Sequence, residues 1–176
     1  MEDMQTTSTV VTTTPQPGHY DIDPHRSRVI FATRHLFGLG RVKGSFAIRG
    51  GTADVADPIE ASVIHAEIDA ASFHTRNPAR DGSVLSPRFL DPAGHPVMIF
   101  RSDRFEAGSQ VLTGTLTVRG TTRPVTLAII QCEASRGSFT ARATTRIDRT
   151  EFGITAARGL AARYLDLTVE IQCTRN

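Results

Sequence analysis

The sequence predicts an all-β protein, an eight-stranded antiparallel barrel with one or two short helices at its rim. Apolar and polar residues alternate with a period of two in one run after another, which places successive side chains on opposite faces of a sheet. Short segments of Gly, Pro, Asp or Ser separate the runs, so consecutive strands are antiparallel neighbours. Eight such strands with one apolar face close most simply into a barrel, because closure removes the exposed sheet edges.

The expected strands follow one another along most of the chain. The alternation is clearest at residues 165–171, where no residue breaks it. The eight expected ranges are 27–33, 41–49, 59–68, 97–105, 112–119, 125–132, 139–147 and 165–171. Cys132 and Cys173 therefore fall on the sixth and eighth strands, about 9–10 Å apart with a strand between them. This separation exceeds what a disulfide tolerates, so we expect two free thiols.

One stretch, residues 77–87, interrupts the β pattern. Asn77 can cap a helix, and Pro78 suits the first helical position. Pro87 must end the helix, since proline lacks the backbone N–H that the helix needs. We expect a helix of two turns between the third and fourth strands, lying across one mouth of the barrel.

Length and composition favour one domain. The chain has 176 residues, of which 39% are hydrophobic and 22% charged, and domains commonly have about 100–200 residues. The net charge is +2 and the arginines are spread along the chain, so the sequence predicts no nucleic-acid partner. No apolar run approaches the roughly 20 residues of a membrane-spanning helix, so we expect no integral membrane segment.

Residues 1–18 are expected to form a disordered N-terminal tail, and residues 19–176 the barrel domain. The tail contains six threonines and ends in a Pro-Gln-Pro-Gly breaker. A secretory signal begins with basic residues and continues with an apolar stretch of about 7–15 residues. Here Glu2 and Asp3 come first and Val10–Val11 is an isolated apolar pair. We therefore expect a cytoplasmic location, where cysteines stay reduced.

The inward positions of the expected barrel combine large and small side chains. Large residues such as Phe46 and Leu116 alternate with small ones, namely Gly44, Gly114, Ala141 and Ala143. An eight-stranded barrel is either filled by its side chains or keeps room for one small ligand. Small residues serve both arrangements, so composition leaves a filled and a hollow interior open.

Four ordered motifs connect the chain to a known family. They are DPHRSRVIF with RHL and VKGSF (residues 23–46), IDAASFHTRN with RD, FLD and HPVMIFRS (68–102), GTLTVRGTTRPV (114–125) and IDRTEFGI (147–154). In this order they resemble the YceI-like family of lipocalin-like polyisoprenoid-binding proteins. Arg26 departs from the family pattern, which has Ser directly after the first His. Many relatives also carry an export signal, which we do not expect for this chain.

The resemblance implies a lipocalin-like barrel with an apolar cavity for a polyisoprenoid, a quinone or another long-chain lipid, and it implies a homodimer. Each buried methylene contributes about 0.8 kcal/mol, so a long lipid can bind tightly without polar contacts. The residues expected to line the cavity are Phe31, Val42, Phe46, Ile48, Leu116, Val118, Ala141, Ala143 and Leu167. Those expected at its mouth are Phe37, Leu39, Leu85, Phe89 and Phe152.

Motifs for catalysis or metal binding are not found. The sequence has no GxSxG motif, and its six histidines lack the spacing of zinc ligands. We therefore expect binding without catalytic residues, metal or cofactor. Two alternatives stay open, an enzyme acting on such a lipid and a filled barrel that serves as an interaction module. The enzyme would use His25 or His35 together with Asp81 as acid and base.

Overall fold

The computed structural model describes residues 12–34, 41–157 and 161–176. Its strands are β1 (Gly18–Ile22), β2 (Arg28–Arg34), β3 (Arg41–Val55), β4 (Val63–Asp69), β5 (Val97–Glu106), β6 (Val111–Val118), β7 (Thr121–Ser135), β8 (Ser138–Asp148) and β9 (Tyr164–Arg175). The helix is α1 (Pro78–Val84), and the short 3-10 turns are η2 (Ile59–Ala61), η3 (Ala70–Ser72) and η4 (Arg149–Phe152). Among the described residues, no helix is long and apolar enough to cross a membrane.

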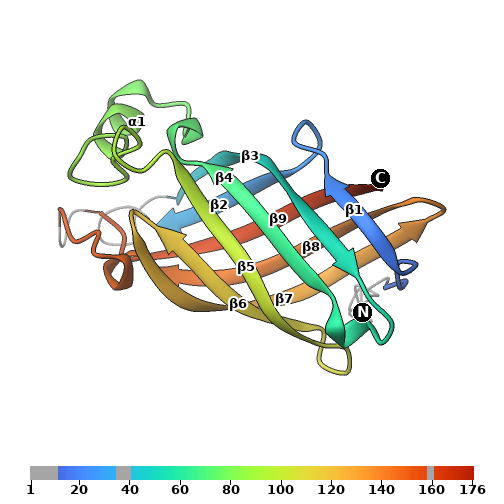
Figure 1. Ribbon diagram of the computed structural model, residues 1–176. Coiled ribbons are helices and arrows are strands. Elements are labelled where there is room, and N and C mark those ends of the chain that lie inside the picture. The colour runs from blue at the N-terminus through green and yellow to red at the C-terminus, as the bar shows by residue number, and fades with distance from the viewer. Residues whose placement is uncertain (1–11, 35–40, 158–160) are drawn as a thin grey trace, which may run out of the picture.

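The strands close into an antiparallel barrel with eight positions, which confirms the predicted fold class (Figure 1). The ring runs β3-β2-β9-β8-β7-β6-β5-β4 and returns to β3 through the β3–β4 pairing. The ninth strand does not add a position, because β1 and β2 lie end to end between β3 and β9. Tyr20 of β1 pairs with Ala53 of β3, and Phe31 of β2 pairs with Gly44 of the same strand.

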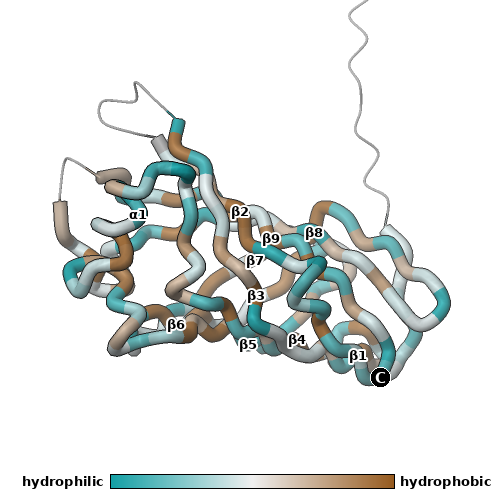
Figure 2. The backbone as a smooth tube through the Cα atoms, turned by 90° about the horizontal axis from the view of Figure 1, so that it is seen from above, coloured by the Kyte–Doolittle hydropathy of each residue, from teal (hydrophilic) through white to brown (hydrophobic). Residues whose placement is uncertain are grey.

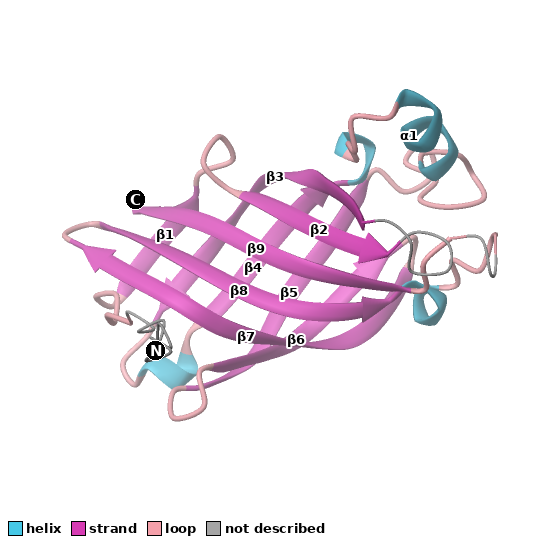
Figure 3. Cartoon of the chain, turned by 180° about the vertical axis from the view of Figure 1, so that it is seen from behind, coloured by secondary structure: helices cyan, strands magenta, loops and turns pink. Residues whose placement is uncertain are grey.

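The ends of the barrel differ in what they carry. At one end, called here the helix end, lie α1, η3, η4 and the β6–β7 turn (Figure 3). At the other, the terminus end, lie the β3–β4, β5–β6 and β7–β8 connections and the C-terminus. Along the strands between them, hydrophobic and hydrophilic residues alternate, as the period of two predicts (Figure 2).

The predicted helix is confirmed, and its capping residue acts as expected. The Asn77 side chain accepts a hydrogen bond from the backbone N–H of Arg80 at 3.0 Å, and Pro78 is the first helical residue. The predicted strand over 59–68 begins later, at Val63. Residues 59–61 form η2 instead, so the chain turns before it enters the sheet.

The last part of the predicted tail lies against the barrel, which differs from the expectation that residues 1–18 are disordered throughout. The backbone N–H of Thr13 donates to the Cys132 carbonyl at 2.8 Å, and the Ala134 N–H donates to the Thr13 hydroxyl at 2.7 Å. The reason lies in β7, whose residues 130–135 extend past the end of β6. Thr13 covers this free edge, whose polar groups need partners.

The terminus end of the barrel is filled by side chains. Tyr20 packs edge-on against Phe139 with ring centroids 5.1 Å apart. Cys173 lies beside this pair in the sheet and is completely buried. Both cysteines are free, as predicted, because β8 lies between the strands that carry Cys132 and Cys173.

Candidate functional site

The barrel encloses a cavity of about 200 Å³. Every strand contributes to its wall through side chains of one parity, such as Ile64, Ala66 and Ile68 on β4. Of the residues that line it, only Thr145 and Arg149 have polar side chains. The cavity lies next to the packed terminus end and extends to the helix end, where Leu90, Phe152 and Ile154 line it. The site is therefore an apolar chamber. It forms because every strand of the closed barrel directs its apolar side chains inward.

Eight of the residues predicted to contact a ligand line this cavity. They are Phe46, Ile48, Leu116, Val118, Ala141, Ala143, Phe152 and Leu167. They come from β3, β6, β8, η4 and β9, which the closure of the sheet places around one space. Their common position in the wall follows from the inward parity that the sequence predicts.

Phe31 and Val42 are buried, as expected, yet they lie in packed core and not in the cavity wall. The Phe31 ring stacks on Phe73 with centroids 5.1 Å apart and lies 5.7 Å from the ring of Phe46. This aromatic cluster fills the barrel beside β2 and β3. The expectation that Phe31 and Val42 line the cavity is corrected accordingly: the ring of Phe73 covers Phe31 from the segment after η3, and Val42 is buried outside the cavity lining.

The residues predicted for the mouth are placed differently from one another. Phe152 lines the cavity, whereas Leu85 and Phe89 are half-buried and pack against the core from the α1 side without lining it. The Phe89 ring instead faces the Arg149 guanidinium, 5.7 Å from its carbon. Phe37 and Leu39 lie outside the described residues.

The small inward residues divide into two kinds. A side-chain carbon on Gly44 would collide with the Phe31 ring and the His74 carbonyl, and one on Gly114 would collide with the backbone of Arg101. These glycines therefore permit close packing and leave no room for a ligand. Ala141 and Ala143, in contrast, line the cavity. The interior is thus filled at the glycines and hollow at the alanines.

Most of the wall consists of residues that the sequence analysis did not single out. Their alternation on β4, β7 and β9 is visible in the sequence. Taking every second apolar residue of each expected strand as inward-facing would have identified them. They include Val29, Ile64, Ile68, Met98, Phe100, Leu112, Leu127, Ile129, Ile147, Leu165, Val169 and Ile171. Ile22 lies on β1, which is not among the eight expected strands. Leu90 and Ile154 lie in connections, for which the strand period gives no signal.

Arg149 is the charged residue in the wall, and it is 8% exposed. Its guanidinium donates to the carbonyl oxygens of Ile154, Ala156 and Ala162 at 2.8–2.9 Å. These bonds hold the segment after η4 across the helix end of the barrel. A buried charge is tolerated where hydrogen bonds replace its hydration, so Arg149 fastens this part of the wall.

Asp148 supports the same turn from outside the cavity. Its carboxylate accepts from Arg163 Nη2 at 2.8 Å and from the Thr150 hydroxyl at 2.6 Å. These hydrogen bonds favour the charged form and hold the pKa of Asp148 at about 2. The carboxylate also accepts from the Thr150 N–H and thereby caps η4. Its low pKa reflects a structural ion pair at the rim.

Of the acid–base candidates of the enzyme alternative, the two that the structure describes, Asp81 and His25, do not line the cavity. Asp81 lies on α1 and accepts from the Thr75 hydroxyl at 2.5 Å, which is the main reason why its pKa is lowered. His25 lies in a separate polar groove beside Arg26 and Arg28, and His35 lies outside the described residues. Within the described part of the chain, no group of His, Cys, Asp and Glu could hold a metal ion.

Comparison with known proteins places this geometry among relatives. The model of the YceI-like domain matches residues 20–174. A UPF0312 protein of Azotobacter vinelandii is 29% identical over 165 residues, covering 88% of this chain and 85% of the relative. Another, of Ectopseudomonas mendocina, is 31% identical over 157 residues, covering 84% and 81%.

Solved structures share the fold at low sequence identity. BcnA of Burkholderia cenocepacia superposes with a TM-score of 0.75 at 18% identity, covering 87% of this chain and 99% of the other. A polyisoprenoid binding domain from Saccharophagus degradans, implicated in plant cell wall breakdown, gives a TM-score of 0.66 at 12% identity, covering 89% and 98%. These similarities establish the barrel architecture.

Proposed function

Because the chain belongs to the YceI-like family, we propose that it is a non-catalytic lipid-binding protein. Its ligand is an isoprenoid, a quinone-like molecule or another long-chain amphiphile, held in the barrel cavity for transport or sequestration. The residues that contact it are those of the cavity wall, with Ala141 and Ala143 making room for it. A cytoplasmic location and a homodimer stay predictions.

The composition of the cavity wall is the observation that supports this proposal. Apart from Thr145 and Arg149, its side chains are hydrocarbon or thioether. The Arg149 guanidinium already donates to four backbone carbonyls. A polar ligand would lose its hydration in such a chamber without compensation, whereas an apolar chain gains about 0.8 kcal/mol for each methylene buried. The wall therefore favours a long hydrocarbon and discriminates weakly among head groups.

The printed description of a structural neighbour supports the same ligand class. The domain from Saccharophagus degradans, which shares the barrel, is described as polyisoprenoid-binding. The placement of Asp81 and His25 outside the cavity wall further favours binding over catalysis on a bound lipid. In the described wall, whose side chains are apolar except for Thr145 and Arg149, no pair of residues supplies both an acid and a base.

Native mass spectrometry of gently purified protein tests the proposal. We expect a species heavier than the polypeptide that releases an apolar molecule on collisional activation, with extraction and fragmentation identifying its class. Ala143→Phe should remove the adduct because its ring occupies the cavity. The control Ala128→Phe makes the same change at an exposed site on β7 and should keep it. A wild-type protein that carries no adduct and takes up no added prenyl or quinone probe would refute the proposal.

A further inference from the structure

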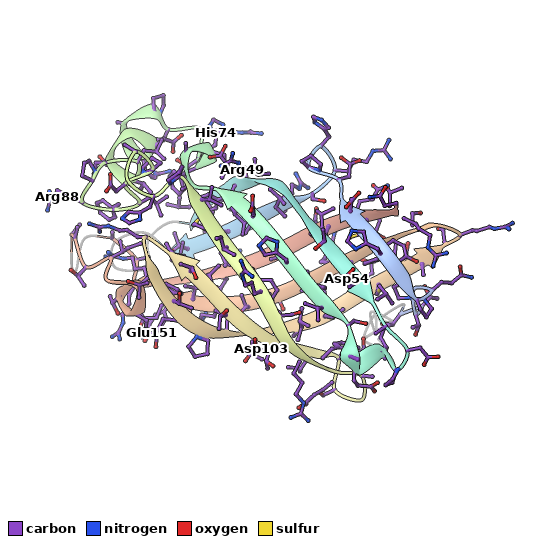
Figure 4. The ribbon with its side chains drawn as sticks, viewed as in Figure 1. Arg49, Asp54, His74, Arg88, Asp103 and Glu151 are labelled. Carbon is purple, nitrogen blue, oxygen red and sulfur yellow. The ribbon has the colours of Figure 1, made fainter. Side chains whose placement is uncertain are left out.

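The two ends of the barrel carry opposite charge. Counting described residues only, the helix end comprises Arg41 and residues 69–96, 119–123 and 146–166, with nine arginines and six carboxylates. The terminus end comprises residues 54–62, 104–110, 133–137 and 174–176, with three arginines and five carboxylates. Arg88 extends from the helix end, whereas Asp54 lies toward the other end (Figure 4). The small net charge of the chain therefore hides an electrical dipole along the barrel axis.

The carboxylates at the helix end are largely engaged, and many of its arginines are not. Asp148 pairs with Arg163, Asp166 pairs with Arg146 at 2.8 Å, and Asp81 accepts from Thr75. Within the described part of the chain, five other guanidinium groups at this end form neither a salt bridge nor a hydrogen bond, namely Arg41, Arg76, Arg80, Arg88 and Arg119, whereas Arg123 donates to the Glu151 carbonyl. These five arginines, called here the rim arginines, come from β3, the segment around α1 and the β6–β7 turn. They lie at the end that the cavity reaches, on the side formed by β3 to β7.

An exposed aromatic side chain lies at the same end. Tyr164, the first residue of β9, is 48% exposed. The guanidinium carbons of Arg163 and Arg146 lie 5.3 and 5.9 Å from the centre of its ring. Tyrosine combines an apolar ring with a polar hydroxyl and is enriched where proteins meet the membrane–water interface, and arginine keeps its charge at the head groups.

We propose that the helix end docks on the surface of an anionic lipid bilayer, with the rim arginines against the phosphate groups and Tyr164 at the interface. The inference rests on the proposed function in one respect, because a cavity ligand with a long hydrocarbon chain leaves and enters water only at a high cost. If the helix end docks on the bilayer, the lipid can pass between the cavity and the membrane without crossing water. The dipole of the barrel turns this end toward a negative surface before contact.

The charge pattern favours a bilayer over a nucleic acid. The rim arginines lie at an end that an apolar cavity reaches and that carries an exposed aromatic ring. A basic patch alone would also suit a nucleic-acid backbone. The apolar cavity and the exposed ring beside these arginines match a lipid surface, which offers hydrocarbon as well as phosphate groups. Near an anionic leaflet each basic residue contributes about 1 kcal/mol, which is roughly a fivefold change in partition coefficient.

Vesicle sedimentation with charge-matched variants tests the proposal. The rim variant combines Arg41→Gln, Arg76→Gln and Arg88→Gln, all at exposed positions. The control variant combines Arg101→Gln, Arg104→Gln and Arg136→Gln, which lie on the barrel wall and the terminus end. Both variants remove three positive charges. The vesicles are phosphatidylcholine alone and phosphatidylcholine mixed with phosphatidylglycerol.

We expect the wild-type protein to bind the anionic vesicles, to release them at high salt, and to bind neutral vesicles weakly. The rim variant should lose about a hundredfold in affinity, three charges at roughly fivefold each, and the control variant should lose far less. Equal losses in the two variants, or no binding by the wild type, would overturn the proposal. Binding to a soluble polyanion such as transfer RNA but not to vesicles would do the same.

A separate readout distinguishes failure of docking from failure of the proposed function. The rim variant should take up a prenyl or quinone probe supplied without vesicles as well as the wild type does, because the rim arginines are not in the cavity wall. Vesicle binding without probe uptake in the wild type would refute lipid binding in the cavity. Probe uptake without vesicle binding would refute docking.

Discussion

Ala143→Phe tests whether the interior of the barrel is free space. Ala143 lies on β8 opposite Ile129 and Val169, and its methyl group lines the cavity. The substitution adds an aromatic ring that points inward. If the cavity is available to a ligand, the ring enters it and displaces the ligand without moving the wall.

The expected magnitude follows from the size of the cavity. An engineered cavity of about 150 Å³ admits benzene, and this one has about 200 Å³. The ring therefore fits, and the free energy of unfolding should change by less than about 1 kcal/mol. In a filled core the same change costs about 1–3 kcal/mol. For a chain of this size each kcal/mol lowers the melting temperature by about 2–4 °C.

The assay measures melting temperature and uptake of a fluorescent prenyl or quinone probe on the same samples. We expect an unchanged melting temperature and lost uptake for Ala143→Phe, and unchanged values of both for Ala128→Phe on the outer face. A melting temperature lowered by more than about 4 °C, together with a wild type that takes up no probe, would refute the reasoning. The filled barrel would then be the correct description of the interior.

Three further predictions concern packing and ionisation. Gly44→Ala should lower the free energy of unfolding by about 1–3 kcal/mol, because the added carbon meets the Phe31 ring and the His74 carbonyl; an unchanged denaturation midpoint would show that both can move aside. Hydrogen bonds from Arg163 and Thr150 hold the pKa of Asp148 at about 2 in the folded protein, whereas an unfolded Asp has a pKa of about 3.9. Asp148 should therefore stabilise the fold at every pH above about 4. This stabilisation should disappear as the pH falls from about 4 to about 2, and Asp148→Asn should remove that part of the pH dependence measured by thermal unfolding. Burial raises the pKa of Cys173 to about 12, so its thiol should resist alkylation in the native protein and react in denaturant; rapid native labelling detected by mass spectrometry would contradict its burial.

Local patterns in the sequence determined the elements and their inward faces. Residues 165–171 alternate strictly, and β9 presents Leu165, Leu167 and Val169 to the cavity as the period of two requires. The helix also follows from local chemistry, since Asn77 caps it through its own side chain. Such features depend on neighbours within a few residues, so the sequence alone is sufficient for them. The order of the motifs likewise pointed to the family whose domain model matches the chain.

Tertiary structure decided which inward side chains face free space. Phe31 and Ala143 both point inward, yet Phe31 is covered by Phe73 and Ala143 lines the cavity. The difference depends on which distant side chains meet across the barrel, and strand parity contains no such information. The same holds for Arg149, whose carbonyl partners lie in a loop without a periodic pattern. Alternation fixes which face of a strand is apolar because it is a property of one strand, whereas the volume left inside is a property of all of them together.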